Sequence, residues 1–122
     1  MSARLDDGGL PAEARAWPFG IAPIVHDKLV RLFEAAPGIE RVWIFGSRAR
    51  GDHRPASDID LAVDMPNGSD RGFAALAGAI EDLELIYRTD VLHWQAVADA
   101  GLRACIERDR RLFWAPRARA GG

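Results

Sequence analysis

The stretch Ile44–Asp64, IFGSRARGDHRPASDIDLAVD, constrains the fold more than any other part of this chain. It begins in an apolar run, turns at Gly46-Ser47, crosses a polar loop, and ends in a second run with acids at alternate positions. In an extended strand, side chains two residues apart point to the same face. We therefore expect Asp58 and Asp60 to lie side by side, with Asp64 further along that face. The apolar residues between them should enter a core.

This pattern has a chemical consequence. Two carboxylates held together repel each other and are costly to keep ionised. A bound divalent cation is the usual remedy, and paired oxygen ligands suit Mg²⁺. The Gly46-Ser47 turn could present backbone N–H groups and a hydroxyl to a phosphate group. The stretch thus indicates a site for a metal ion and a phosphate.

The rest of the chain alternates helical and strand patterns. Pro23 suits the first position of a helix, and Pro37-Gly38 suits its end. The helices are predicted over Pro23–Ala36, Ser47–Arg50 (one turn), Arg71–Leu83 and Ala96–Leu112, and the strands over Ile39–Phe45, Asp58–Val63 and part of Leu85–Trp94. Strands separated by helices predict an α/β (α+β) fold, a small mixed sheet of about three strands flanked by about four helices.

Length and composition predict one ordinary globular domain. The chain has 122 residues, of which 48% are hydrophobic and 28% charged, enough for a single core. We expect a loose arm over residues 1–20, a body over 21–115 and a frayed tail over 116–122. The net charge of −2 gives no general attraction to nucleic acid or membranes. Without a secretory or membrane-spanning segment, a cytoplasmic protein is the expectation.

Four aromatic residues and the single cysteine are predicted to have structural roles. Cys105 falls within an apolar helical pattern, which predicts a buried thiol. Trp43, Trp94, Trp114 and Tyr87 are expected to pack in the core or against a neighbouring surface.

Three pieces of the sequence form a combination that is more informative than any of them alone. They are Gly46-Ser47, Asp58-Ile59-Asp60 after ten intervening residues, and a later lone acid, Asp90. Here the chain resembles the minimal nucleotidyltransferases of the DNA polymerase beta-like superfamily. Their signature is Gly-Ser, about ten residues, Asp-x-Asp, and a third carboxylate on the next strand. The resemblance covers Pro23 to Phe113.

The resemblance implies the nucleotidyltransferase fold and a role for each matched residue. Gly46 and Ser47 would hold the β- and γ-phosphates of ATP, and Asp58 and Asp60 would ligate two Mg²⁺ ions. Asp90 would complete the metal site and help to deprotonate the attacking hydroxyl. Two metal ions can clamp the attacking and leaving oxygens of such a displacement.

The neighbours of these residues receive weaker predictions. Arg48 and Arg50 flank the phosphate turn, so that one of them, Arg48 in our assignment, could contact the triphosphate. A solvated loop arginine is an equal alternative for each. Asp64 is expected to play a structural or supporting role, and His53 could reach the mouth of the site without being a ligand.

Short chains of this family resemble the antitoxins of prokaryotic toxin–antitoxin modules, whose partner is a HEPN-domain ribonuclease toxin. The resemblance implies transfer of AMP from ATP to a hydroxyl of that partner, and leaves a homo- or hetero-oligomer open. Two alternatives also stay open. The protein could be a non-catalytic antitoxin that neutralises its partner by binding, or a transferase acting on a small-molecule hydroxyl or an RNA end.

Overall fold

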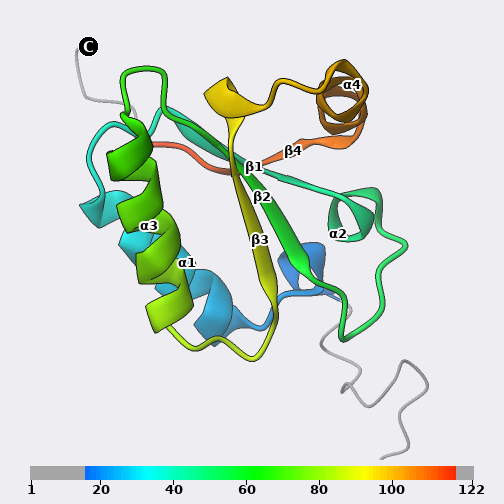
Figure 1. Cartoon of the computed structure of the whole chain (residues 1–122). Helices are drawn as coiled ribbons and strands as arrows, with labels where there is room; N and C mark the ends of the chain where they lie inside the picture. Colours follow the sequence, from blue (N-terminus) through cyan, green and yellow to red (C-terminus); the bar gives the residue numbers. More distant parts are fainter. Residues whose placement is uncertain (1–15, 118–122) are drawn as a thin grey trace, which may run out of the picture.

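The computed structural model describes residues 16–117 and shows a four-stranded mixed sheet with helices on both sides (Figure 1). Its helices are α1 (Pro23–Ala35), α2 (Ser47–Arg50), α3 (Asp70–Asp82) and α4 (Ala100–Asp109), with 3-10 turns η2 (Pro18–Gly20) and η3 (Trp94–Ala96). Its strands are β1 (Arg41–Phe45), β2 (Ile59–Asp64), β3 (Thr89–His93) and β4 (Arg111–Trp114). The predicted α/β class is confirmed, and the predicted elements lie close to these bounds, except at the C-terminal end.

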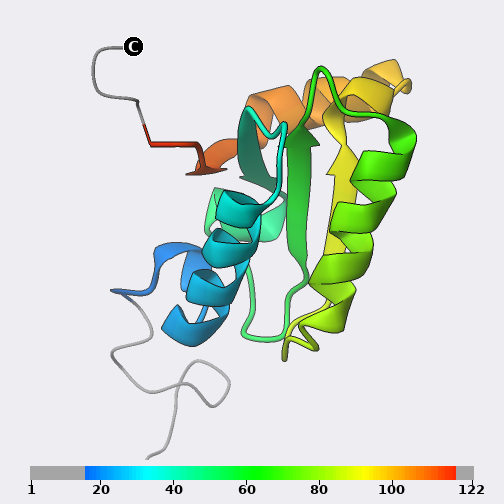
Figure 2. The same ribbon diagram turned by 90° about the vertical axis from the view of Figure 1, so that its left-hand side faces the viewer.

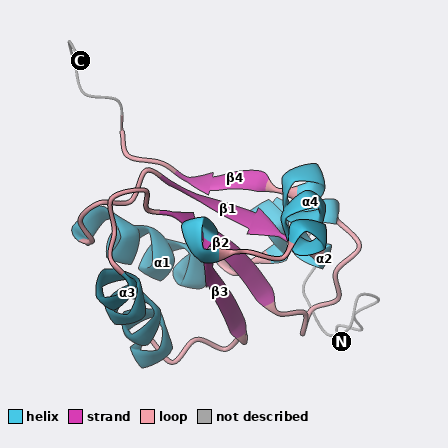
Figure 3. Ribbon diagram, turned by 45° about the horizontal axis from the view of Figure 1, so that its top comes forward, coloured by secondary structure: helices cyan, strands magenta, loops and turns pink. Residues whose placement is uncertain are grey.

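The strands run in the order β3-β2-β1-β4, which Figure 3 shows from above. The central pair β1 and β2 is antiparallel, as is β1 with β4, whereas β2 and β3 are parallel. A parallel pair needs a long crossover, and α3 supplies it. Ser69 caps this helix by accepting a hydrogen bond from the Gly72 N–H at 2.9 Å.

The main core lies between the sheet and the pair α1 and α3, which lie in front of the sheet in Figure 2. The apolar residues of β2 that alternate with its acids enter this core, as the sequence predicts. The buried members include Val25, Leu29, Phe33, Val42, Ile44, Ile59, Leu61, Val63, Leu76, Ile80 and Phe113.

The opposite face of the sheet is covered only in part. Ala62, Trp94 and Ile106 form a small second core there, and Trp43 packs against it with its ring 5.5 Å from that of Trp94. Ile106 is the only buried residue of α4. The helix therefore covers a limited area of this face.

The C-terminal end corrects two predictions. The helix expected to reach Leu112 ends at Asp109, and the next residues form the fourth strand, paired with β1. The apolar pair Leu112-Phe113 follows the helical pattern, and such a pair fits the last turn of a helix and a short strand equally well. Pairing with β1 decides in favour of the strand. Cys105 is exposed, not buried, because it lies on the outer side of α4.

Two further observations concern the ends and the membrane. Phe19 packs against the main core, while residues 1–15 and 118–122, where most of the predicted arm and tail fall, lie outside the described residues. Within residues 16–117, no helix is long and apolar enough to cross a bilayer.

Candidate active site

One edge of the sheet gathers the polar residues that the sequence singles out. The strand register pairs Phe45 at the end of β1 with Asp60 at the start of β2, and Asp60 with Asp90 at the start of β3. On the other side of β1, Ile44 pairs with Arg111 at the start of β4. The end of β1 and the starts of the three other strands therefore meet at this edge.

The three predicted acids lie together at this edge. Asp60 and Asp90 are register partners on neighbouring parallel strands, and Asp58 precedes β2. Asp58 and Asp90 are exposed, whereas Asp60 is half-buried. Burial raises the pKa of Asp60 to about 6, and the negative charges of Asp90 and Asp58 act in the same direction. A carboxylate in such surroundings favours a nearby cation.

Gly46 brings the turn after β1 directly against the Asp60 carboxylate. Its φ of 77° and ψ of −158° lie in a region that L side chains rarely adopt. A Cβ at this position would overlap Asp60 Oδ2 and lie 3.2 Å from its Cγ. Glycine is needed for both reasons. The turn and the carboxylate could not approach so closely with any other residue.

Ser47 begins α2 immediately after this turn. Ala49 and Arg50 donate their backbone N–H groups to the Gly46 carbonyl, each at 3.1 Å. The N–H groups at the very start of a helix have no acceptor within that helix. The start of α2 therefore directly follows the turn that lies against the Asp60 carboxylate.

The geometry of Arg48 differs from the prediction. Its side chain is 2% exposed, and its five N–H donors make five hydrogen bonds of 2.9–3.1 Å to backbone carbonyls. The acceptors are Phe19, Gly20, Pro55 and Ser57. With all its donors occupied, this guanidinium has none left for a triphosphate. Arg48 instead fixes the loop that presents Asp58.

Tyr87 and His53 complete the surroundings of Arg48. The Arg48 guanidinium lies 4.7 Å from the centre of the Tyr87 ring, and the Tyr87 hydroxyl accepts a hydrogen bond from the Ala22 N–H at 3.0 Å. His53 packs against Gly20, and burial lowers its pKa. Sequence patterns miss this cluster, because a buried arginine and an exposed one look the same in a polar loop.

Asp64 lies at the far end of β2. It forms an ion pair with Arg41 at 3.1 Å and accepts a hydrogen bond from the Gln95 side chain. These contacts hold the strand end and the η3 turn together. The structure therefore separates Asp64 from the other two acids of the motif.

The acids present fit a magnesium ion that also binds a substrate. No group of three His, Cys, Asp or Glu among residues 16–117 is arranged to enclose an ion. Mg²⁺ commonly takes only one or two carboxylates and completes its octahedron with waters and substrate phosphates. An open cluster of carboxylates around Asp60, with the Gly46 turn beside it, suits that mode of binding.

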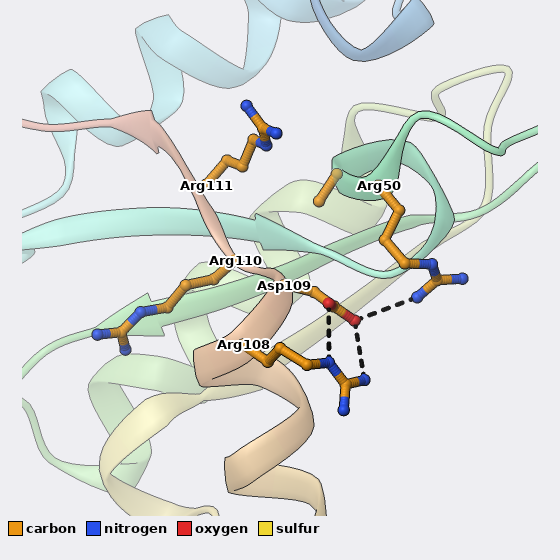
Figure 4. Close-up of a pocket in the computed structure, with 6 residues that line it drawn as sticks. Arg50, Arg108, Asp109, Arg110 and Arg111 are labelled. Atoms are coloured by element: carbon orange, nitrogen blue, oxygen red, sulfur yellow. Dashed lines mark hydrogen bonds and ion pairs between the residues drawn. The ribbon is translucent and has the colours of Figure 1, made fainter.

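Arg50 is the arginine that faces the solvent beside the site. It is hydrogen-bonded to Asp52 at 3.2 Å and Asp109 at 3.4 Å, as Figure 4 shows for the second of these. The positive charges of Arg48 and, to a smaller extent, Arg50 lower the pKa of Asp60, although less than burial and the neighbouring acids raise it. Because all five N–H donors of Arg48 are occupied and the Arg50 side chain is exposed, Arg50 is the one with a solvent-facing guanidinium near the carboxylates.

This fold and this arrangement of residues match a known family. The family model described as polymerase beta, nucleotidyltransferase, matches residues 27–116. The chain therefore belongs to the polymerase beta nucleotidyltransferase family, as its motif indicates. None of the curated protein sequences is similar enough to count as a relative.

Several solved structures with a similar fold come from toxin–antitoxin complexes. A chain of a toxin–antitoxin complex with AMP-PNP is 21% identical, with a TM-score of 0.58 over 75% of this chain and 74% of that one. A chain of the complex between tri-AMPylated HEPN toxin and MNT antitoxin from Shewanella oneidensis is 19% identical, with a TM-score of 0.54 over 76% and 71%. A chain of the MntA–HepT complex is 18% identical, with a TM-score of 0.54 over 78% and 74%.

Proposed function

We propose that this protein is a Mg²⁺-dependent nucleotidyltransferase that moves AMP from ATP to a hydroxyl group of a partner protein, a HEPN-type toxin. The observation that carries the proposal is the contact of Gly46 with Asp60, which is in turn the register partner of Asp90. This contact supports the proposal because the Gly46-Ser47 turn and the acids lie within one small area.

Each residue of this area has a role in the proposal. Asp58 and Asp60 hold Mg²⁺, and Asp90 completes the metal site. When bound, the metal ions supply charge neutralisation at the triphosphate. Gly46 and Ser47 bind the β- and γ-phosphates through backbone N–H groups and the hydroxyl.

The reaction that these residues serve is a single displacement. The acceptor oxygen forms a bond to the α-phosphorus of ATP, and the bond from that phosphorus to the bridging oxygen breaks, so that pyrophosphate leaves. The acceptor's proton passes to a carboxylate, for which Asp90 is the candidate because it is exposed and adjacent to Asp60. Such transfers depend mainly on positioning and charge neutralisation.

Similarity to the solved complexes supports a protein acceptor. The Shewanella oneidensis HEPN toxin is tri-AMPylated in its complex with MNT antitoxin, and a related complex contains AMP-PNP. These statements concern those proteins, and we extend them to this chain because family, fold and motif agree.

Transfer of label from ATP tests the proposal. The protein is incubated with Mg²⁺, ATP labelled at the α-phosphate, and a lysate of its source organism or the purified HEPN protein of that organism. We expect a labelled protein band with wild type and none with the double variant Asp58→Asn/Asp60→Asn. The control, Asp27→Asn/Asp82→Asn, removes two exposed carboxylates from α1 and α3 and should label normally.

Two results would change the proposal. Undiminished labelling by the Asp58→Asn/Asp60→Asn variant would show that these acids are not needed for transfer. An unlabelled HEPN partner that this double variant still neutralises would favour an antitoxin that acts by binding alone.

A further inference from the structure

Four arginines surround a shallow hollow at the same edge of the sheet as the acids (Figure 4). The hollow has a volume of about 430 Å³ and lies between α2 and the junction of α4 with β4. We call the set Arg50, Arg108, Arg110 and Arg111 the arginine surface. Asp109 is the only acid that lines the hollow, so the lining carries a net of three positive charges in a chain whose net charge is −2.

Three of these arginines are held in place by neighbours. The Asp109 carboxylate accepts hydrogen bonds from Arg108 at 3.1 and 3.3 Å and from Arg50 at 3.4 Å. The Arg110 guanidinium lies 3.9 Å from the centre of the Trp43 ring. Cations fixed in this way lose less side-chain freedom when they bind a partner.

The arginine side chains spread apart from one another and do not converge. In Figure 4, Arg110 and Arg111 extend in different directions from the junction of α4 with β4, and Arg50 and Arg108 lie on either side of Asp109. A single phosphate group could not contact all four guanidinium groups. An extended partner with several separate negative charges could do so.

The position of the arginine surface determines which partner can reach it. Three strand spacings separate β3, which carries Asp90, from β4, a distance of about 14 Å. A standard protein interface covers about 800 Å² on each partner, which corresponds to a disc of about 16 Å radius. A protein that places a hydroxyl beside Asp60 and Asp90 therefore also covers the arginine surface.

We propose that the arginine surface docks an acidic segment of the protein that receives the nucleotide. This inference rests on the proposed function, because it takes the acceptor to be a protein. Complementary charge would align the acceptor and speed its association. The same edge of the sheet would thus bind metal and nucleotide at its acidic side and the acceptor's acidic segment at its basic side.

Binding of a simple acidic probe tests this without any transfer reaction. Fluorescein-labelled deca-glutamate is titrated with the protein at low ionic strength, about 20 mM salt, with neither ATP nor Mg²⁺ present. The test variant is Arg108→Gln/Arg111→Gln, which spares Arg50 beside Asp60 and Arg110 on Trp43. The control, Arg31→Gln/Arg71→Gln, removes two exposed arginines from α1 and α3 on the other face.

We expect the peptide to bind wild type and the control equally, and the test variant about tenfold more weakly. Binding should weaken steeply as salt is added. Equal binding by wild type and the test variant, or no binding by wild type, would overturn the proposal. The proposal would also be overturned if an oligo(A) RNA bound more tightly than the peptide through the same arginines, or if equimolar pyrophosphate displaced the peptide. Because ATP is absent, these outcomes are independent of whether the protein transfers AMP.

Discussion

At the scale of single residues, Asp60 is the acid of the site that is both partly buried and in contact with the Gly46 turn. It is half-buried, its register partner is another acid, and the Gly46 backbone lies against its carboxylate. Burial in this position raises the pKa of Asp60 to about 6, against an ordinary value of 3.8. A residue kept in these costly surroundings, with two acids beside it, is typical of a functional site.

The raised pKa of Asp60 predicts how stability depends on pH when no metal is present. Between about pH 4 and 6, the folded protein binds more protons than the unfolded chain, so its free energy of unfolding falls as the pH rises. Asp60→Asn should flatten this dependence and stabilise the protein at pH 8 by on the order of 1 kcal/mol, since water partly screens the carboxylate. Urea titrations in EDTA from pH 4.5 to 8 measure it. A steeper fall in the variant than in wild type would contradict the pKa direction.

A second prediction at this scale concerns the contribution of Arg48 to stability. Arg48→Met would leave the carbonyls of Phe19, Pro55 and Ser57 without their donor, at a cost of about 3 kcal/mol or more. Arg48→Lys should restore only part of this, because lysine has three donors in place of five. Arg31→Met, at a side chain that is 78% exposed, serves as the control. Denaturant unfolding that gave equal stabilities for Arg48→Met and Arg31→Met would exclude the role of Arg48 in holding the loop.

At the scale of elements, the sequence predicted those helices and strands whose formation depends on nearby residues. The alternation of Ile59, Leu61 and Val63 with acids correctly predicted β2, and Pro23 correctly marked the start of α1. The fourth strand was missed because its formation depends on pairing with β1, which no local pattern encodes. The same applies to the Arg48 contacts, which connect residues up to 29 positions apart.

The candidate site also contains residues that the sequence predicted and residues that it did not. Motif spacing singled out Gly46, Asp60 and Asp90 as one combination, and the strand register shows that they meet at one edge of the sheet. The arginines of the α4–β4 junction could not be predicted there, since their position follows from the unexpected strand. Cys105 was assigned to the wrong side of α4, because that helix buries a single residue and its apolar pattern is weak.

The strand β4, which the sequence did not predict, leads to a prediction about stability. Phe113 is 8% exposed and packs against Phe33, with ring centres 6.1 Å apart. Phe113→Ala should therefore destabilise the protein by about 3 kcal/mol. Leu112, its neighbour in the strand, is 57% exposed, and Leu112→Ala should cost less than about 0.5 kcal/mol. Thermal or denaturant unfolding of the two variants compares them. Similar losses would contradict the alternation of faces in β4.

At the scale of the whole molecule, one edge of the sheet carries both signs of charge. The acids lie at the β2 and β3 side, and the arginines lie on α2 and at the β4 side. The net charge of −2 conceals this separation. The surface that the proposed metal, nucleotide and acceptor share is therefore concentrated at a single edge, while α1 and α3 support it from the other face (Figure 1).

Metal binding should be visible in the stability of the whole chain. Mg²⁺ that binds only the folded state should raise the free energy of unfolding by about 2.7 kcal/mol at one hundred times its Kd. Melting temperatures with and without Mg²⁺ should differ for wild type and for Asp27→Asn/Asp82→Asn. They should be equal for Asp58→Asn/Asp60→Asn. An equal rise in all three proteins would place the ion elsewhere.

In the proposed function, this edge of the sheet transfers the α-phosphoryl group of ATP, with its nucleoside, to a protein hydroxyl. The most direct measurement follows two labels in parallel reactions with the HEPN partner, one on the α-phosphate and one on the γ-phosphate. We predict that the α-label enters the partner protein while the γ-label leaves as pyrophosphate, in equal amounts and only with Asp58 and Asp60 intact. Entry of the γ-label into the partner, or release of single phosphate without α-label in protein, would contradict the claim.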